Sequence, residues 1–573
     1  MGVSRAQVEV ALGRNRQLEA LVACLLCEGQ AVRHRSVRKE ELGCSNAHDP
    51  LLDREWPKGL GRPPLCSSLS RPPQPGRSQD WRERIACGED TVNFVVIVSD
   101  TFRRDHLGCY GNRWIHTRNL DRFAAESLVF DRAYAASFPT VPNRRDVLTG
   151  RFTFTYSDWA PLPPDEVVLA EVMGKAGYTT MMILDTPHIV ARGFNFGRGF
   201  GGWDWVRGQE HDAWATSPRD PKLPCAPEKL RMPFTTVKQY LRNVSQRREE
   251  ADHFVAQTMS RAMTWLERNL GCQPFLLYVD TFDPHEPWDP PHWYVDLYDP
   301  GYEGEEVIYP KYAPCDFLSE AELKHVRALY AGEVTLVDTW VGRLLARIDD
   351  LGLRDDTVVV FTTDHGFYHG EHGLMGKSLL TEEYYGSVPL YEEVAHIPLI
   401  VRVPGRQPGR TRAIVQPPDL MPTILDAAGL EIPNVVHGES FLPVLRGQRE
   451  CHRSLALTSP SIIYGARAVQ FTTITDGEWS LIYPGARLDT DAAVAEGRAV
   501  DSIRRVHRAL YRGAGGPELY HLPSDPAQQN NVFAQRREVA QRLHAEHVAF
   551  LESIGTPEEH LANRRELTDQ VLP

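Results

Sequence analysis

Four uninterrupted apolar stretches predict buried β-strands. They cover residues 93–100, 274–279, 357–361 and 396–403. Apolar runs of this length, without alternation, are typical of strands that are buried on both faces of a parallel sheet. Asp100, Asp280 and Asp364 stand at or just past the ends of three of these runs.

Between the apolar runs, the spacing of apolar positions changes to that of helices. We predict helices over residues 117–126, 166–175, 251–270 and 320–351. Strands that alternate with helices indicate an α/β fold, a sandwich with a mostly parallel central sheet flanked by helices. Functional side chains of such sheets gather where the strands end. We therefore predict a site at the three acidic residues.

A smaller unit is expected after residue 415. Leu420 opens a helical pattern, and later patterns predict strands near residues 462–474 and 479–483 and a final helix over 534–554. We expect a catalytic α/β domain over residues 89–415. We expect a small C-terminal α+β subdomain with an antiparallel sheet over residues 416–573.

Two segments break these patterns. Residues 1–88 are rich in Arg, Pro and Ser and lack periodicity, so a disordered N-terminal extension is expected. Residues 201–250 hold several tryptophans, prolines and charges, and we interpret them as an insertion near the site. The sequence leaves open whether this insertion walls a pocket or is a plain surface excursion.

Composition excludes several classes of function. The formal net charge of −13 argues against a nucleic-acid partner, which requires a basic surface. No apolar run is long enough for a membrane-spanning helix, so no membrane partner is expected. Among the ten cysteines, Cys24 and Cys27 form the one close pair, and no partner pair stands at zinc-site spacing, which favours free thiols and a cytoplasmic location. A small anionic substrate is compatible with this charge, and a homo-oligomer stays open.

A short motif around Thr140 narrows the chemistry. The chain reads Thr-Val-Pro-Asn-Arg from Thr140 to Arg144 and then Leu-Thr-Gly-Arg from Leu148. This pattern resembles the signature of the sulfatase family, within the alkaline phosphatase superfamily. In that family a cysteine stands in the place of Thr140 and is oxidised to formylglycine, the nucleophile. Threonine has no thiol to convert, but its hydroxyl can attack phosphorus when a metal lowers its pKa.

Two further segments resemble the metal-binding segments of sulfatases. Asp100 precedes an Arg-Arg-Asp stretch and a Gly-Cys-Tyr-Gly turn, and Asp364-His365-Gly366 precedes a Glu-His-Gly stretch and a Gly-Lys pair. The resemblance implies one divalent ion (Mn, Ca, Mg or Zn), held by Asp100, Thr140, Asp364 and His365. Their oxygen and imidazole ligands suit these ions to different degrees. A second ion at Asp280, His188 or His372 stays open, and Asp100 as a plain helix cap is the alternative.

The resemblance also assigns three charged or titratable side chains. It implies that Lys377 contacts the anionic group of the substrate, and that His285 faces the leaving group as a general acid. Arg144, one helical turn after Thr140, would stabilise the nucleophile or an oxyanion. The alternatives are a solvated lysine, a loop-packing histidine and an ordinary N-cap threonine.

One segment departs from the family pattern. After Tyr178 a sulfatase carries a Gly-Lys pair and a histidine that touch the sulfate. Here the lysine is absent, and Asp185 stands near its place. Thr186 and His188 remain as candidates to line the pocket, together with His372 and Asp280. The departure argues against a sulfate-specific site.

The resemblance covers residues 93–550, including a closing Glu-Leu-Tyr-His-Leu motif from Glu518. We expect a metal-dependent hydrolase that cleaves phosphodiester or phosphonate monoester bonds, similar to the phosphonate monoester hydrolase and phosphodiesterase relatives. An arylsulfatase-like sulfuric ester hydrolase is the alternative. A phosphoryl-group transferase and a non-catalytic binding protein are further alternatives.

Overall fold

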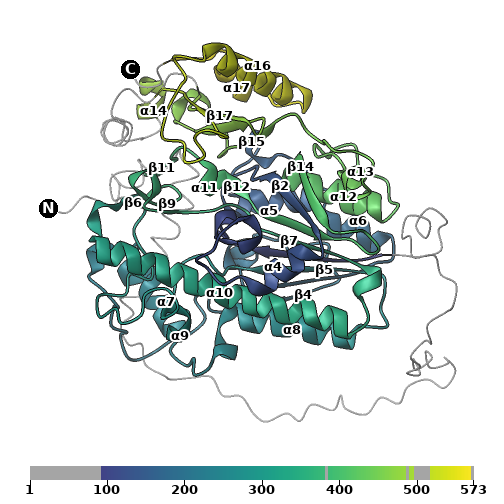
Figure 1. Ribbon diagram of the computed structural model, residues 1–573, viewed down its shortest axis with the longest axis vertical. Coiled ribbons are helices and arrows are strands. Elements are labelled where there is room, and N and C mark those ends of the chain that lie inside the picture. Colours follow the sequence, from purple (N-terminus) through teal and green to yellow (C-terminus); the bar gives the residue numbers. More distant parts are fainter. Residues whose placement is uncertain (1–91, 381–384, 486–488, 496–515, 570–573) are drawn as a thin grey trace, which may run out of the picture. The chain divides into compact units, whose positions relative to one another are not determined.

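Five parallel strands form one side of a large sheet in the computed structural model (Figure 1). The structure describes residues 92–380, 385–485, 489–495 and 516–569, so the expected extension over residues 1–88 lies outside it. The parallel strands lie side by side in the order β4 (Gly202–Trp205), β3 (Thr179–Leu184), β5 (Phe275–Thr281), β1 (Asn93–Ser99) and β7 (Thr357–Thr362).

The sheet continues past β7 with strands of mixed direction. β13 (Leu399–Arg402) runs antiparallel to β7, β2 (Leu128–Tyr134) antiparallel to β13, and β12 (His396–Ile397) antiparallel to β2. β14 (Gly409–Val415) pairs in parallel with β2. Residues 396–403 were expected to form one parallel strand, which is wrong. Pro398, which has no N–H to donate to a ladder, separates β12 from β13.

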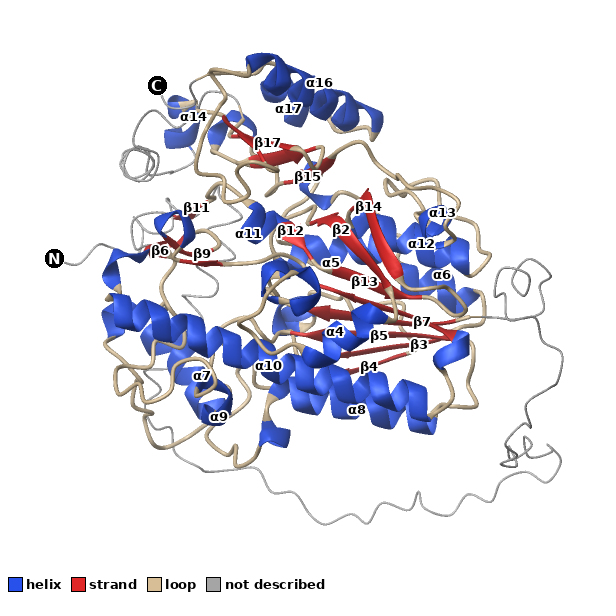
Figure 2. Cartoon of the chain, viewed as in Figure 1, coloured by secondary structure: helices blue, strands red, loops and turns tan. Residues whose placement is uncertain are grey.

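Helices cover both faces of the large sheet (Figure 2). Val95 and Ile97 of β1 belong to the core on one face, beneath α4 (Arg118–Ala125), α8 (Phe254–Arg268) and α10 (Glu320–Asp350). Phe94 and Val96 belong to the opposite core, beneath α5 (Thr140–Thr149), α6 (Leu169–Lys175) and α12 (Leu420–Ala427). The expected α/β sandwich is confirmed.

A smaller antiparallel sheet follows near the C-terminus. Its strands are β15 (Ala456–Thr458), β16 (Thr472–Thr475), β17 (Trp479–Tyr483) and β18 (Glu518–His521), and α16 (Arg537–Ser553) packs against them. The expected small sheet is confirmed, although of the run 462–474 only its end is a strand. α12, which we expected in this subdomain, packs on the large sheet, and so does α13 (Leu442–Leu445).

Short elements complete the described part of the chain. The helices are α7 (Lys238–Asn243), α9 (His292–Val295), α11 (Glu392–Ala395), α14 (Thr490–Ala495) and α17 (Glu558–Leu561). β6 (Ala313–Pro314), β9 (Leu374–Gly376) and β8 (Tyr368–His369) form a three-stranded sheet, and β10 (Leu379–Leu380) pairs with β11 (Tyr385–Gly386). None of the described helices has the length and apolar character needed to cross a bilayer.

Candidate active site

The carboxyl ends of four of the parallel strands, β1, β3, β5 and β7, carry most of the predicted site residues. Asp100 follows β1, and Asp364 and His365 follow β7. Asp280 lies near the end of β5, with His285 in the loop beyond it. Thr186 and His188 follow β3. Because these strands run in parallel, all of these residues reach the same edge of the sheet.

Asp100, Asp364 and His365 form a buried group whose ligand atoms all lie within 4.8 Å of one another. The Thr101 amide donates to Asp364 Oδ1 at 2.9 Å, and the Thr101 hydroxyl donates to Asp100 Oδ1 at 2.6 Å. Asp100 Oδ2 accepts no hydrogen bond from the described residues, although Arg144 Nη1 lies 2.9 Å away. Two carboxylates and an imidazole this close together supply a ligand set that fits a divalent cation.

The pKa shifts of the two carboxyl groups in this group also favour a bound cation. Burial, reinforced by the neighbouring Asp364, raises the pKa of Asp100 well above its usual value. Burial also acts to raise the pKa of Asp364, but the charges of Arg144, His365 and Lys377 outweigh it and hold that pKa below its usual value. A bound cation would relieve the repulsion between the two carboxylates.

Arg144 is fully buried and joins three acidic residues. Its Nη1 pairs with Asp100 and Asp364, while Nε and Nη2 donate to Asp280 at 3.1 and 3.0 Å. Asp280 also accepts the hydroxyl of Thr186 at 2.6 Å. Both Asp280 oxygens are therefore engaged in holding Arg144, and Thr186 supports that contact. A bidentate arginine–carboxylate pair fixes the guanidinium in one orientation.

Thr140 is the first residue of α5, and the residues around it contact the metal-binding group. The ring of Phe138 lies 4.9 Å from that of His365, and Asn143 Nδ2 donates to the Asp364 carbonyl at 3.0 Å. We expected the helix to start at Asn143, three residues later. Pro142 is tolerated in the first turn because N–H groups there have no partner within the helix. The Thr140 hydroxyl thus lies at the positive end of the helix.

The comparison with known families agrees with this geometry. The family model for sulfatases matches residues 92–430, more than half of the chain. The chain belongs to the sulfatase family. Its relatives place it in the alkaline phosphatase superfamily, among hydrolases that act on ester bonds.

Individual relatives are distant. An arylsulfatase of Clostridium perfringens is 27% identical over 410 residues, which cover 63% of this chain and 80% of that protein. The solved phosphonate monoester hydrolase of Agrobacterium radiobacter has a TM-score of 0.59 at 20% identity, covering 81% of this chain and 95% of that one. A structure in complex with its substrate D-glucosamine-2-N,6-O-disulfate has a TM-score of 0.60 at 20% identity, covering 82% and 99%.

Lys377 and His285 are two further buried groups in this sulfatase-family site. Lys377 follows β9, and its Nζ lies 3.3 Å from His365 Nε2. His285 Nδ1 donates to the Glu286 carbonyl at 2.7 Å, and its ring stacks on Phe282 with centroids 4.0 Å apart. Burial, with a smaller contribution from Lys377, lowers the pKa of His285 well below its usual value. The imidazole is therefore neutral, with its lone pair on Nε2.

Asp185, which stands near the place of the family's lysine, is engaged by hydrogen bonds within the protein. Its carboxylate accepts the hydroxyls of Thr258 and Thr281 at 2.7 and 2.9 Å and the amide of Phe282. It therefore fixes the turn after β5. The described contacts of His372 also lie elsewhere, because its ring stacks on Tyr391 at 3.7 Å and its Nε2 lies 3.3 Å from Glu393.

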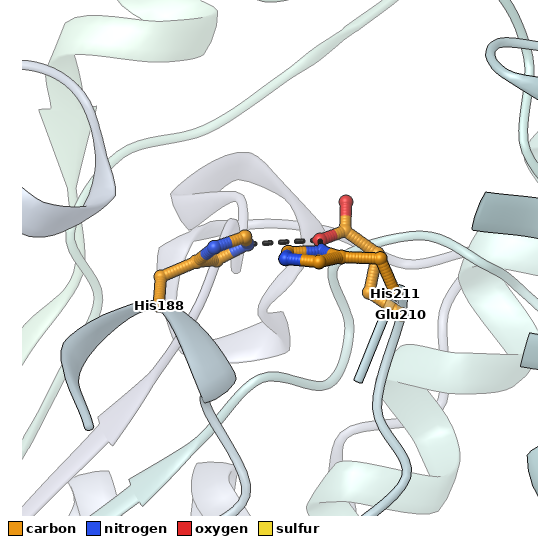
Figure 3. A group of neighbouring side chains, drawn as sticks. All are labelled: His188, Glu210 and His211. Atoms are coloured by element: carbon orange, nitrogen blue, oxygen red, sulfur yellow. Dashed lines mark hydrogen bonds and ion pairs between the residues drawn. The ribbon is translucent and has the colours of Figure 1, made fainter. Parts of the chain in front are cut away.

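Two residues missed by the sequence reasoning contact His188. Glu210 and His211 belong to the segment 201–250, which begins with β4 and so contributes a strand to the large sheet. Glu210 Oε2 lies 2.9 Å from His188 Nε2 and 2.8 Å from His211 Nδ1 (Figure 3). The signal for them was a polar Glu-His pair just after an alternating Gly-Trp-Asp-Trp stretch.

Proposed function

We propose that this sulfatase-family protein hydrolyses phosphodiester or phosphonate monoester bonds, with Thr140 as the nucleophile. The observation that carries the proposal is the position of Thr140. It occupies the signature place of formylglycine, at the start of α5, and Asn143 and Arg144 of the same helix bind Asp364. A hydroxyl there can form a phosphate or phosphonate ester. Threonine cannot be oxidised to formylglycine, because its Cβ carries a methyl group and would give a ketone in place of the aldehyde.

The other residues receive the following roles in this proposal. Asp100, Asp364 and His365 would hold the divalent ion (Mn, Ca, Mg or Zn) together with Thr140. When bound, the ion lowers the pKa of the attacking hydroxyl and offsets negative charge. Arg144 keeps the carboxylates in place, and Lys377 neutralises the oxygens of the ester.

His285 handles the proton in this scheme. Its neutral ring can accept at Nε2 the proton that the Thr140 hydroxyl loses on attack and pass it to the departing alkoxide. The ester formed at Thr140 is then cleaved by water. Threonine has no hemiacetal through which to expel the group, so water must attack the central atom.

Sulfuric ester hydrolysis is the second candidate, and the family supports it. Several relatives carry sulfatase names, among them the arylsulfatase of Clostridium perfringens. Against it, the carboxylate of Asp185 is engaged by Thr258 and Thr281 near the place where the family carries a sulfate-contacting lysine. The proposal therefore ranks phosphorus esters above sulfate esters.

The test is a panel of aryl sulfate, phosphate monoester, phosphodiester and phosphonate monoester substrates, assayed with each of the four metals. We expect the phosphodiester and phosphonate to be turned over fastest. Thr140→Ala should lower kcat by a factor on the order of 10³ or more. Thr149→Ala is the matched control, because that threonine lies in the same helix and donates to the Arg145 carbonyl at 2.7 Å. Dominant aryl sulfate turnover, or an active Thr140→Ala variant, would contradict the proposal.

A further inference from the structure

Two histidines and a glutamate converge beyond the ends of β3 and β4, apart from the group at β1 and β7. His188 Nε2 and His211 Nδ1 both approach Glu210 Oε2, at 2.9 and 2.8 Å. The ligand atoms of all three residues lie within 4.8 Å of one another (Figure 3). Two imidazole nitrogens and one carboxylate oxygen suit Zn²⁺ and its transition-metal neighbours better than Ca²⁺ or Mg²⁺.

We propose that His188, Glu210 and His211 bind a divalent transition-metal ion of the Zn²⁺ class. This site is separate from the one formed by Asp100, Asp364 and His365. Three protein ligands leave a coordination position for water or another ligand, as in zinc sites that are not purely structural. The inference does not rest on the proposed function.

The carboxylate oxygen of Glu210 that the histidines do not approach, Oε1, is held by other side chains. It accepts the hydroxyl of Tyr309, and Arg231 Nη2 lies 3.4 Å away. The backbone of Glu210 has φ +47°, the left-handed region that is unfavourable for a residue with a Cβ. The same Arg231 Nη2 pairs with Glu286 at 2.6 Å, so Glu210 shares this one guanidinium with a second carboxylate. Such outer hydrogen bonds orient the ligands of metal sites.

The close approach of two imidazoles to a single carboxylate oxygen favours a bound cation. Both rings crowd one oxygen with their centroids 5.2 Å apart, where two protonated rings would repel each other. One cation between the three side chains satisfies them together.

The cluster is open enough for an ion to enter. The side chains of His188 and His211 are 15% and 28% exposed, while that of Glu210 is 5% exposed. Trp159 lies against His188, with ring centroids 5.2 Å apart, and is itself partly exposed. The buried carboxylate thus anchors the site, and the two imidazoles face the entry.

The cluster shares no residue with the first metal-binding group. Its residues follow β3 and β4, whereas Asp100 and Asp364 follow β1 and β7, and β3 lies two strands from β1. The ring of His188 lies 5.4 Å from that of Phe282, which stacks on His285. The ion would therefore lie on the His285 side of the active site, with a ligand of its own.

Zinc content by mass spectrometry after desalting tests the site directly. The Asp364→Asn variant, which lacks a ligand of the first group, should retain one zinc ion per chain. Adding His211→Gln should remove that ion, whereas adding His116→Gln, an exposed histidine, should not. The wild-type chain should also lose one ion with His211→Gln, which covers the case of an unstable Asp364→Asn protein.

A second variant probes the support of the carboxylate. Tyr309→Phe keeps all three ligands but removes the hydroxyl bound to Glu210 Oε1. Its zinc stoichiometry at saturation should be unchanged, and its affinity in a chelator competition should fall about 10- to 100-fold. The proposal is overturned if His211→Gln leaves the zinc content unchanged in both backgrounds, or if Tyr309→Phe leaves the affinity unchanged. No readout involves turnover, so failure here is distinct from failure of the proposed function.

Discussion

The surroundings of a histidine decide which proton transfers it can perform. His285 is buried, and its Nδ1 donates to the Glu286 carbonyl at 2.7 Å. Burial and the charge of Lys377 lower its pKa, so the ring is neutral in the free protein at pH 7. The sequence resemblance implies a general acid. The structure adds a condition, because the ring must first accept a proton at Nε2 before it can donate one.

This condition predicts the pH dependence of kcat/KM. The neutral ring is the working form, so activity should be constant above pH 6.5 and fall only as the pH drops through the lowered pKa. His285→Gln should remove that acidic limb and reduce the rate about 10²- to 10⁴-fold. His372→Gln is the control, because His372 stacks on Tyr391 and should leave the limb in place. An acidic limb in the wild type with its midpoint above pH 6.5 would contradict the assignment.

Among the elements, the long helix α10 supports the first metal-binding residue. The hydroxyl of Tyr330 donates to the Thr101 carbonyl at 2.7 Å and accepts the Arg103 amide at 2.9 Å. Thr101 has φ +59°, an unfavourable conformation that places its amide on Asp364 Oδ1. One side chain of α10 therefore fixes the turn that carries Asp100.

Tyr330→Phe should weaken both folding and metal binding. It leaves a buried carbonyl and amide without their partner, at a cost of about 1–3 kcal/mol in the free energy of unfolding. Metal affinity at the Asp100 site should also fall about 10-fold or more. Tyr298→Phe is the matched control, because that hydroxyl bonds to Thr335 of α10 and to the His116 amide.

Urea denaturation and metal titration of the two variants separate these effects. Both variants should lose stability, whereas only Tyr330→Phe should lose metal affinity. Equal metal affinity in the two variants would show that α10 does not support the site.

At the scale of the whole molecule, the sequence predicts the elements that a local pattern encodes. It does not predict features that depend on contacts between distant segments. The bounds of β1, β7 and α10 follow closely from the sequence because long apolar or periodic stretches define them. The four-residue strand β4 is too short to leave such a pattern. The direction of β13 depends on its neighbours in the sheet rather than on its own residues.

The candidate site likewise contains residues that a local motif predicts and pairs that only long-range contacts bring together. The motif resemblance predicted Asp100, Asp364 and His365, and the structure brings them together. The pairing of Arg144 with Asp280 joins residues 136 positions apart, so no local pattern encodes it. Glu210 was missed for the same reason, because it meets His188 only where β3 and β4 end side by side.

A buried ion pair joins the large sheet to the C-terminal unit. Asp419, just before α12, accepts Arg453 Nε at 2.8 Å, and Arg453 lies just before β15. The guanidinium also lies over the rings of Phe152 and Phe550, the second of which belongs to α16. Burial acts to raise the pKa of Asp419, but Arg453 outweighs it and holds that pKa well below its usual value.

Arg453→Met should therefore destabilise the protein in a pH-dependent way. Removing the guanidinium leaves the buried Asp419 with only His452 among the described residues, whose Nε2 lies 3.4 Å away, as a basic neighbour, at a cost of about 3–5 kcal/mol at pH 7. Because the folded pKa of Asp419 is depressed, the contribution of the pair is complete above the unfolded pKa of about 4 and is lost as the pH falls through the folded value. The difference in unfolding midpoint between wild type and variant should shrink towards about pH 3. Arg565→Met, which breaks an exposed pair with Glu558, should change the midpoint little at either pH. A constant difference between wild type and Arg453→Met across this range would show that packing on Phe152 and Phe550, and not the ion pair, holds the two units together.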